Sequence, residues 1–442
     1  MSYDETIAYL FGLQKHGIKL GLSNSFLLMD LLGNPQRRFA SLHVAGTNGK
    51  GSTSAFLASI LAAGGRRVGL YTSPHLVSFT ERIRINGVPI AESRVVELAD
   101  RLRGLISGLP DAGGNGEVSP TFFEVTTALA FAYFAEEGID CAVVEAGMGG
   151  RLDSTNVVTP LVSVITNIDL EHTEFLGESI EEIAGEKAGI IKPGVPVVTG
   201  AVQQEALGVI EAEALRQGSP VYVLHRDFDA RRTIGGREQR MDYRGTGTTR
   251  RDLAIGMTGR HQVDNAALAL AALEAAGSRL PVSDDALAKG LAGARWEGRL
   301  ERVSERPDVY LDGAHNPASA EVLADALSEM KPHYRALVLV LGILRDKDWR
   351  GIIERLVPLA DRVIVTAPSY GRAMDASSLA AQVKQLHGDV ASAGTVEQAV
   401  RQAAAEAGPG DLVVITGSLY TVGDARAVLV KDAGASLRQL KG

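Results

Sequence analysis

Short apolar runs rich in Val and Ile alternate with longer segments of helical spacing over residues 40 to about 200. Short apolar runs bounded by glycine are typical of buried strands, and the periodic segments between them predict helices. Parallel strands need crossover connections, which are usually helical. The alternation therefore predicts an α/β fold around a central, mainly parallel sheet. The predicted strands are SLHVAG, RVGLYTS, CAVVEAG, VSVITNI and VPVVTG.

The same alternation resumes near residue 298, after a polar segment and two helical ones. Residues 226–252 are rich in Gly and Arg and predict hairpins or loop outside the core, whereas residues 260–277 and SDDALAKGLAGA predict helices. We therefore expect a larger α/β domain over residues 1–297, with a central, mainly parallel sheet, and a smaller Rossmann-like α/β domain over residues 298–442. In the second domain the predicted strands are DVYLDGA, RALVLVLG, DRVIVTA and DLVVITG, with helices at about 318–330, 347–358, 376–386, 395–406 and 420–432.

The stretch HVAGTNGKGST, residues 43–53, lies between a predicted strand and a predicted helix. The backbone N–H groups of a glycine loop, a helix N-terminus and the Lys50 ammonium group together suit a phosphate. The spacing departs from the usual P-loop pattern, because Val44 stands where that pattern has its first glycine. An ordinary glycine turn is the alternative. The order strand, loop, helix favours nucleotide binding, so we expect the domain of residues 1–297 to be a P-loop ATPase domain.

Candidate magnesium ligands follow three of the predicted strands. ATP is accompanied by Mg²⁺, which prefers hard oxygen ligands, and parallel α/β sheets bind ligands at the carboxyl ends of their strands. Glu145 lies at such an end, and Ser73 follows another strand. Asp169 and His172 follow a third. From position alone, Glu145 could equally be a structural ion pair, Ser73 a turn residue and His172 a loop residue.

Two other segments carry charged or polar side chains at predicted strand or helix ends. Lys187 lies soon after the candidate metal edge, where a free ammonium group would be repelled by a cation. Carbamylation by CO2 would make this side chain an anion, and an ordinary surface lysine is the alternative. LDGAHNP places Asp312, His315 and Asn316 before a helix, as nucleotide or substrate contacts or as simple helix caps.

Composition narrows the class of protein. The chain has 442 residues and is 45% hydrophobic, enough for a sizeable core, and its net charge is −8. A broad basic field is therefore not expected, so neither nucleic acid nor a membrane is predicted as a partner. The single cysteine, Cys141, cannot form an intrachain disulfide, and the N-terminus lacks the pattern of a secretory signal. We expect a cytoplasmic protein.

Eight segments of the chain together form a recognisable series. They are HVAGTNGKGST, TSPHL with ERIRING, FFEVTTALAF, EAGMGGRLDSTN, NIDLEHTEFLG through GEKAGIIKPG, LDGAHNP, GILRDKD and ITGSLYTV. In this order they resemble the folylpolyglutamate synthase and dihydrofolate synthase family, a branch of the Mur-type ATP-dependent ligases. The resemblance extends over nearly the whole chain. It also accounts for the unusual loop, because this branch places its hydroxyl residue one position later, at Ser52 here.

The resemblance implies a role for individual residues. It implies Mg²⁺, with two ions, held by Ser73, Glu145 and His172, and a carbamylated Lys187. It implies catalytic roles for Lys50, Lys187, Arg299 and His315. It implies that the ATP contacts are Thr47, Asn48, Gly49, Lys50, Gly51, Ser52, Asn265, Arg299 and Asp312. It implies substrate contacts at Phe123, Glu124, Arg151, Asp153, His315 and Ser418, and in the early segment LGLSNSF.

The reaction implied by the resemblance joins L-glutamate to a pteroate or folate carboxylate through an acyl phosphate made from ATP. We expect both activities, on dihydropteroate and on reduced folates, in a monomer whose partners are small molecules. A Mur-type ligase acting on a cell-wall precursor is a second interpretation. A nucleotide-gated ATPase switch is a third, and it predicts ADP release that ignores glutamate.

Overall fold

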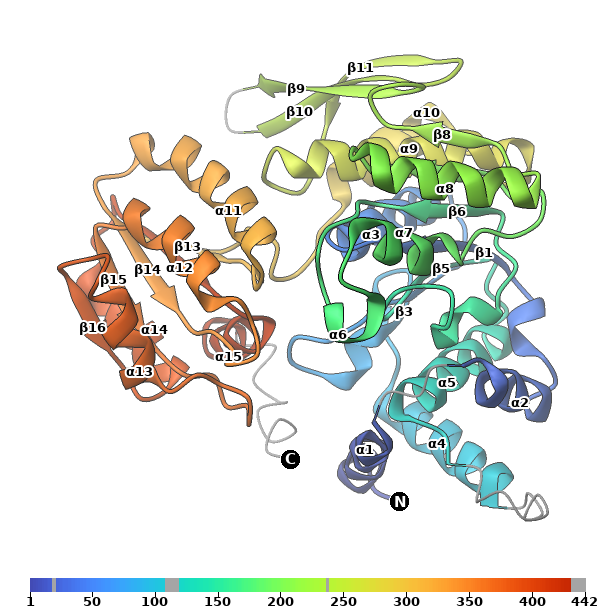
Figure 1. Cartoon of the computed structure of the whole chain (residues 1–442), viewed down its shortest axis with the longest axis horizontal. Helices are drawn as coiled ribbons and strands as arrows, with labels where there is room; N and C mark the ends of the chain where they lie inside the picture. The colour runs from blue at the N-terminus through green and yellow to red at the C-terminus, as the bar shows by residue number, and fades with distance from the viewer. Residues whose placement is uncertain (18–20, 108–118, 236–237, 431–442) are drawn as a thin grey trace. The chain divides into compact units, whose positions relative to one another are not determined.

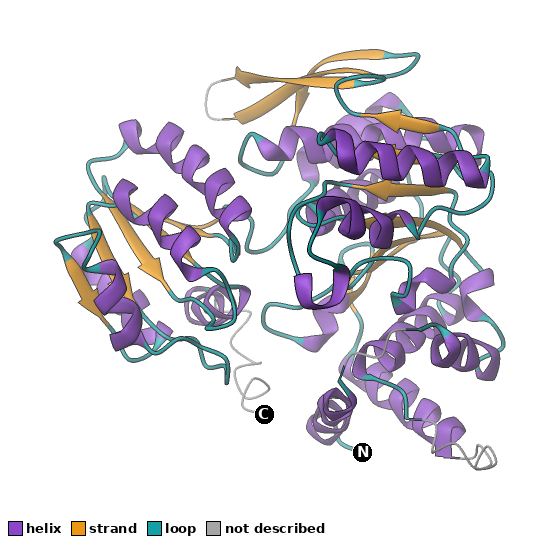
Figure 2. Ribbon diagram, in the orientation of Figure 1, coloured by secondary structure: helices purple, strands orange, loops and turns teal. Residues whose placement is uncertain are grey.

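The computed structural model describes residues 1–17, 21–107, 119–235 and 238–430. The chain divides into two compact units. The larger contains residues 1–75, 79–256 and 262–295, and the smaller contains residues 76–78, 257–261 and 296–442. Both are α/β structures, as the sequence predicts (Figures 1 and 2).

The larger unit is built on an eight-stranded sheet in the order β4-β3-β2-β5-β1-β6-β7-β8. Six neighbouring strands are parallel, and β3 and β4 are antiparallel at one edge. The five predicted strands are confirmed, and β3, β4 and β8 are additional. The bounds are β1 Ala40–Ala45, β2 Val68–Tyr71, β3 Ile83–Ile85, β4 Val88–Pro89, β5 Cys141–Glu145, β6 Val162–Ile165, β7 Val197–Thr199 and β8 Val221–Val223.

Helices cover both faces of this sheet (Figure 2). One apolar cluster joins α1, α2, α4 and α5 to β2 and β5, and another joins α7 and α8 to β6 and β7. Within the described ranges, no helix has both the length and the apolar character to cross a membrane. The bounds are α1 Tyr3–Gly12, α2 Ser23–Leu31, α3 Lys50–Ala63, α4 Glu92–Ser107, α5 Phe122–Glu136, α6 Thr173–Leu176, α7 Ile180–Ala188, α8 Gln204–Gln217, α9 His261–Ala276 and α10 Asp284–Gly293.

The Gly- and Arg-rich segment forms a separate antiparallel sheet, as predicted, with the order β11-β10-β9. Its strands are β9 Asp229–Gly235, β10 Glu238–Arg244 and β11 Thr249–Ala254. Glu274 of α9 holds this sheet, because its carboxylate accepts hydrogen bonds from the Tyr243 hydroxyl and the Thr246 N–H, both at 3.2 Å. The segment therefore lies outside the main core.

The smaller unit has a six-stranded sheet in the order β12-β13-β17-β14-β15-β16, with β12 antiparallel to its neighbour. The four predicted strands and five predicted helices are confirmed, and β12 and β16 are additional. The strands are β12 Glu301–Glu305, β13 Asp308–Leu311, β14 Leu337–Leu341, β15 Arg362–Val365, β16 Val390–Ser392 and β17 Leu412–Thr416. The helices are α11 Pro317–Met330, α12 Trp349–Leu356, α13 Ala376–Val383, α14 Val396–Glu406 and α15 Leu419–Leu429.

The topology of the larger sheet makes its carboxyl edge a place to bind a ligand. From β1 the chain passes through α3 to β2 on one side, and β6 lies on the other side of β1. Loops that leave neighbouring strands in opposite directions leave a crevice between them. The register aligns Val44 with Glu145 and Ala45 with Ile165, so the glycine loop, the end of β5 and the end of β6 share this edge.

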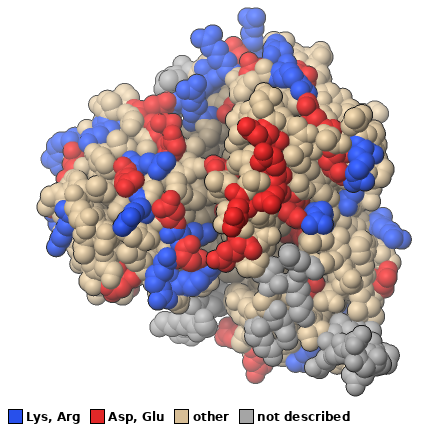
Figure 3. Space-filling view, in the orientation of Figure 1, with Lys and Arg blue, Asp and Glu red and all other residues tan. Residues whose placement is uncertain are grey.

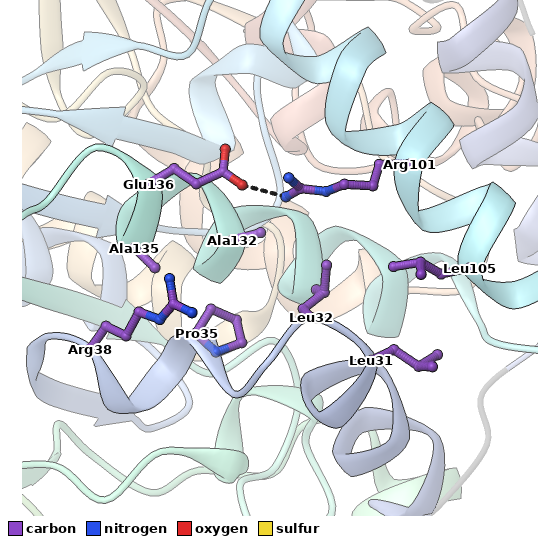
Figure 4. A pocket seen from close by; sticks show the side chains of 9 residues that line it. All are labelled: Leu31, Leu32, Pro35, Arg38, Arg101, Leu105, Ala132, Ala135 and Glu136. Atoms are coloured by element: carbon purple, nitrogen blue, oxygen red, sulfur yellow. Dashed lines mark ion pairs between the residues drawn. The ribbon is translucent and has the colours of Figure 1, made fainter.

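A cavity of about 370 Å³ lies elsewhere in the larger unit, among α2, α4 and α5 (Figure 4). Six of its nine lining residues are Leu, Pro or Ala, and Arg101 and Glu136 form an ion pair of 2.5 Å at its wall. The lining residues include none of the predicted site residues. We interpret this cavity as a gap in the packing of the helices.

Gly290 lies at a close contact between helices α10 and α3 of this unit. A Cβ atom at Gly290 of α10 would lie 2.3 Å from the Ile60 Cα atom of α3, whereas one at Gly293 would meet nothing nearer than 3.8 Å. We expect Gly290→Ala to cost about 1–3 kcal/mol through overpacking. Gly293→Ala is the matched control and should change stability little. Thermal denaturation followed by circular dichroism measures both, and equal midpoints would contradict the packing argument.

Candidate functional site

Two glycines of the loop after β1 lie so close to other residues that a side chain would not fit. Gly46 has φ +146°, and a Cβ atom there would lie 1.9 Å from the Thr166 Oγ1 atom. Gly49 has φ +83° and precedes α3, and its Cβ atom would lie 2.4 Å from the Asn265 Oδ1 atom. Positive φ angles are costly for residues with a side chain. The backbone conformation and the lack of room for a Cβ atom therefore both require glycine at these two positions.

The segment after β6 holds the loop through its backbone. The Thr47 N–H donates to the Asn167 carbonyl at 3.0 Å, and the Asn48 N–H donates to the Asn167 Oδ1 atom at 2.7 Å. The Thr166 hydroxyl donates to the Asn48 carbonyl at 2.6 Å. The Thr47 hydroxyl also lies 3.0 Å from the Asp169 N–H, which donates to it. The loop is thus fixed by the neighbouring strand end.

Two lysine side chains converge on one carbonyl group of this loop. The ammonium groups of Lys50 and Lys187 each donate to the Gly46 carbonyl at 2.9 Å, and Lys50 also donates to the Thr47 carbonyl at 2.9 Å. Burial, together with the nearby Lys50 charge, lowers the pKa of Lys187 to about 7. The structure therefore buries Lys187 beside the loop, which excludes the ordinary surface lysine.

The predicted magnesium ligands lie at the ends of β2 and β5 and after β6. The Glu145 carboxylate is buried, and its Oε2 atom accepts a hydrogen bond from the Ser73 N–H at 3.1 Å. His172 precedes α6 with φ +51°, and its Nε2 atom lies 3.7 Å from a Glu171 carboxylate oxygen. The structure thus brings Ser73 and Glu145 together and places His172 on the loop after β6.

No group of three or more His, Cys, Asp or Glu side chains that could hold a metal ion occurs in the part of the chain that the structure describes. Mg²⁺ commonly takes only one or two protein carboxylates and fills its other positions with phosphate and water oxygens. A buried carboxylate beside a serine, next to a glycine loop, fits that kind of site. It does not fit an ion held entirely by the protein.

The start of α9 lies against the other side of the glycine loop. The Asn265 Nδ2 atom donates to the Gln262 Oε1 atom at 3.0 Å, and the Gln262 Nε2 atom donates to the Ser52 hydroxyl at 3.3 Å. All three side chains are buried. Asn265 and Ser52 were predicted from the sequence, and Gln262 was not.

The predicted pterin contacts at the start of α5 lie next to the chain after β5. A Cβ atom at Gly147 would lie 2.4 Å from the Phe123 ring, so the backbone passes directly over this ring. Glu124 is buried and accepts the Thr121 N–H at 2.6 Å in a capping box, and it accepts Asn24 Nδ2 at 3.3 Å. Asn24 belongs to the predicted segment LGLSNSF, whose first residue, Leu20, lies outside the described residues.

Arg151 and Asp153 have different surroundings. Arg151 is exposed and donates to the Glu186 carboxylate at 2.6 Å. Asp153 is buried, its carboxylate accepts the Met148 N–H at 2.9 Å and the Thr155 N–H at 3.0 Å, and burial raises its pKa. The structure therefore shows Asp153 holding the glycine-rich turn after β5.

A histidine that the sequence analysis missed extends this network. The Nε2 atom of His43 lies 2.9 Å from the Thr155 hydroxyl, which in turn donates to Asp153. Burial and the charge of Lys192 lower the pKa of His43 to about 3, so the imidazole is neutral. His43 thus joins β1 to the turn after β5.

In the smaller unit, Asp312 and Arg299 lie beside each other at the end of β13. Asp312 is buried and accepts the Leu300 N–H and the Ala314 N–H, both at 2.9 Å. Burial raises its pKa, and the Arg299 charge opposes that shift. A Cβ atom at Gly313 would lie 2.2 Å from an Arg299 Nη1 atom, so the guanidinium group crosses this turn.

His315 and Ser418 follow two neighbouring strands of the same sheet, β13 and β17. The His315 Nδ1 atom lies 2.8 Å from the Gly313 carbonyl oxygen. Ser418 is buried and caps α15, because its hydroxyl accepts the Thr421 N–H at 3.0 Å. Both side chains thus lie at the carboxyl edge of this sheet.

Charged side chains are unevenly distributed on the face in Figure 3, where Asp and Glu side chains gather in one area of the larger unit. At the glycine loop, the groups that provide positive potential are the backbone N–H groups, the Lys50 ammonium group and the buried Lys187.

Comparisons with known proteins identify the family. The Mur ligase middle domain matches residues 44–273, and the Mur ligase glutamate ligase domain matches residues 298–419. A dihydrofolate synthase/folylpolyglutamate synthase of Bacillus subtilis is 39% identical over 96% of this chain and 98% of the relative. The chain belongs to the folylpolyglutamate synthase and dihydrofolate synthase family. It is therefore an ATP-dependent glutamate ligase.

Solved structures agree with this assignment. Folylpolyglutamate synthase of Mycobacterium tuberculosis, complexed with ADP, has a TM-score of 0.88 and 38% identity, covering 97% of this chain and 99% of that one. An Escherichia coli relative complexed with DHPP and ADP has a TM-score of 0.87 and 34% identity, covering 99% of both chains. The family predicted from the sequence is confirmed, and the roles of individual side chains remain predictions.

Gly49→Ala tests the close approach between the loop and α9. We expect at least a tenfold loss of ADP affinity, about 1.4 kcal/mol, because the new Cβ atom would displace Asn265. Gly65→Ala is the matched control, since Gly65 has φ +81° at the other end of α3 and a Cβ atom there meets nothing within 4 Å. Isothermal titration with ADP measures both, and equal affinities would contradict the argument.

Proposed function

We propose that this protein adds L-glutamate both to dihydropteroate and to reduced folates, including their polyglutamates. The observation that supports this most directly is the full-length likeness to a relative named for both activities. A solved relative bound to DHPP and ADP supports a nucleotide and a second small molecule as ligands of this fold. The likeness to folate enzymes also favours this substrate class over a cell-wall precursor.

The glycine loop is the proposed site for the phosphates of ATP. The N-terminus of α3 and the N–H groups of the loop supply donors, and Lys50 supplies a cation. Lys50 at present donates to two loop carbonyls, Gly46 and Thr47, which a phosphate oxygen would replace as its partners. Thr47, Asn48, Gly49, Gly51, Ser52 and Asn265 are the other proposed contacts in the larger unit.

Mg²⁺ would be held by Glu145, Ser73 and His172, together with oxygens of the nucleotide and water. When bound, the ion neutralises phosphate charge and polarises the γ-phosphoryl group. The buried Glu145 carboxylate, which lies beside Ser73 at the end of β5, supports this assignment most directly, because Mg²⁺ prefers hard carboxylate oxygens.

The chemistry divides into two displacements. A substrate carboxylate oxygen attacks the γ-phosphorus, the bond to the β-phosphate oxygen breaks, and an acyl phosphate and ADP form. The neutral α-amine of glutamate then attacks the acyl carbon, phosphate leaves, and the amine gives up a proton. Lys50 and Arg299 are the proposed cationic partners of the transferred charge, and His315 is the proposed proton acceptor.

The pterin side of the substrate would lie against α5 and the turn after β5. The Phe123 ring offers an aromatic face for stacking, and Glu124 offers a carboxylate already oriented by Thr121. Arg151 is the exposed cation of this group, and Asp153 would act by holding the turn. In the smaller unit, Asp312 and Arg299 are the proposed nucleotide contacts, and His315 and Ser418 are the proposed glutamate contacts.

Lys187 is the proposed site of carbamylation. Its amine attacks the carbon of CO2, one C–O electron pair moves to oxygen, and the nitrogen releases a proton. Only the neutral amine can react, and a pKa of about 7 leaves much of this side chain neutral near physiological pH. The product is an anion, which relieves the crowding of two ammonium groups at the Gly46 carbonyl.

We also propose that the protein acts as a monomer in the cytoplasm, with small molecules as its partners. The relatives solved with ADP and DHPP support the small-molecule partners.

Glutamate-dependent ADP release tests the proposed activity. We expect purified protein with ATP and Mg²⁺ to release ADP only when L-glutamate and either dihydropteroate or tetrahydrofolate are both present. One amide should form per ADP, measured by mass spectrometry of the pterin. Release without glutamate would instead indicate an ATPase switch. Release with only one of the two acceptors would contradict the proposed dual activity.

Carbamylation of Lys187 can be measured with ¹³C-labelled bicarbonate. We expect a carbamate carbon signal in the NMR spectrum that grows as pH rises through about 7 at constant dissolved CO2, because the neutral amine fraction rises through the pKa. The signal should vanish in Lys187→Met. Lys192→Met is the matched control, since burial also lowers the pKa of Lys192, and it should keep the signal. A signal retained in Lys187→Met would refute the assignment.

A further inference from the structure

Gln262 is a buried amide that has no role in the function described so far. It lies in the first turn of α9 and is fully buried. Its side chain connects Ser52 and Asn265, which are far apart in the sequence and both lie at or against the glycine loop. The Oε1 atom accepts from Asn265 at 3.0 Å, and the Nε2 atom donates to the Ser52 hydroxyl at 3.3 Å.

The direction of these hydrogen bonds fixes what Ser52 can do. An amide nitrogen only donates, so the Ser52 oxygen acts as the acceptor for Gln262. The hydroxyl hydrogen of Ser52 is then left to donate elsewhere. Among the residues that the structure describes, Ser52 has only this one hydrogen bond through its side chain. A phosphate oxygen is a strong acceptor for such a hydrogen.

The same amide also orients Asn265. Because the Gln262 Oε1 atom accepts from the Asn265 Nδ2 atom, the Asn265 Oδ1 atom faces the other way, where it lies 3.5 Å from the Thr53 hydroxyl. That oxygen is also the atom that a Cβ at Gly49 would strike. Gln262 therefore sets the direction of two side chains that contact the loop.

Packing alone does not explain this residue. A fully buried polar amide destabilises the folded protein when it is left without partners, whereas Leu or Met would fill a similar volume without that cost. Both ends of Gln262 are used, and both partners lie at or against the glycine loop.

We propose that Gln262 is a positioning residue for nucleotide binding, which turns the Ser52 hydroxyl into a hydrogen-bond donor toward a phosphate oxygen. This inference rests on the proposed placement of phosphate at the glycine loop. Gln262 itself does not touch the nucleotide, and it acts through Ser52 and, at its other end, through Asn265.

A double-mutant cycle between Gln262→Met and Ser52→Ala tests the proposal in the full-length protein, with ADP as the ligand. We expect each single variant to weaken ADP binding roughly tenfold, or about 1.4 kcal/mol. In the double variant the loss of ADP affinity should be clearly smaller than the product of the two single losses, because removing the hydroxyl also removes the part of the Gln262 effect that passes through Ser52. KM values for glutamate and the pterin should stay within twofold of the unchanged protein.

Gln36→Met is the matched control. Gln36 is another buried glutamine, and its amide nitrogen donates to the Asn34 side chain at 3.0 Å, away from the loop. We expect Gln36→Met to lose thermal stability to a similar extent as Gln262→Met, without a loss of ADP affinity.

If Gln262→Met does not fold, Gln262→Glu replaces it in the cycle. This variant keeps the acceptor for Asn265, but an ionised carboxylate takes the Ser52 hydrogen, so it should bind ADP more weakly still.

The outcomes distinguish a failure of the proposed role of Gln262 from a failure of the proposed phosphate site. If Ser52→Ala weakens ADP binding and Gln262→Met multiplies that loss independently, the inference about Gln262 fails and the phosphate site stands. If Gln262→Met lowers only thermal stability, as Gln36→Met does, the residue is structural and the inference fails. If Ser52→Ala leaves ADP affinity unchanged, the proposed role of Ser52 fails, and the inference fails with it.

Discussion

The approach of the Gly46 backbone to Thr166 is the contact on which the rest of the site depends. Parallel pairing of β1 and β6 brings these two strand ends together. The absence of a Cβ atom at Gly46 then lets the Thr166 hydroxyl lie against the loop and donate to the Asn48 carbonyl at 2.6 Å. Once this contact is made, the direction of the Gly46 carbonyl is set, and both lysines meet there.

Electrostatics at that carbonyl explains why the site favours an anion. Two ammonium groups share one acceptor, and the burial of Lys187 removes water that would otherwise screen their repulsion. The protein relieves part of this repulsion by lowering the pKa of Lys187. A phosphate near Lys50, or a carbamate on Lys187, would relieve more of it, so each would stabilise the folded protein as well as serve the reaction.

The sequence predicts the central strands because they are buried on both faces and read as continuous apolar runs. It misses β3, β4, β8, β12 and β16, which lie at or near sheet edges and lack such continuous apolar runs. Position and spacing identify the glycine loop and suggest Glu145 and Lys187 as candidates. Gln262 and Asn167 leave no such signal. Ser52 and Gln262 are 210 residues apart, and a hydrogen bond between them has no local pattern.

The hydrogen bonds that tie the loop to the segment after β6 also affect how tightly a ligand can bind. A flexible loop would lose conformational entropy on closing around a phosphate, at a cost of roughly 1–2 kcal/mol for each residue that becomes fixed. Here Thr47 and Asn48 are already fixed by Asn167. These residues are therefore already ordered when the sheet has folded. A nucleotide that binds the loop loses less binding free energy to the ordering of the loop, and its affinity is correspondingly higher.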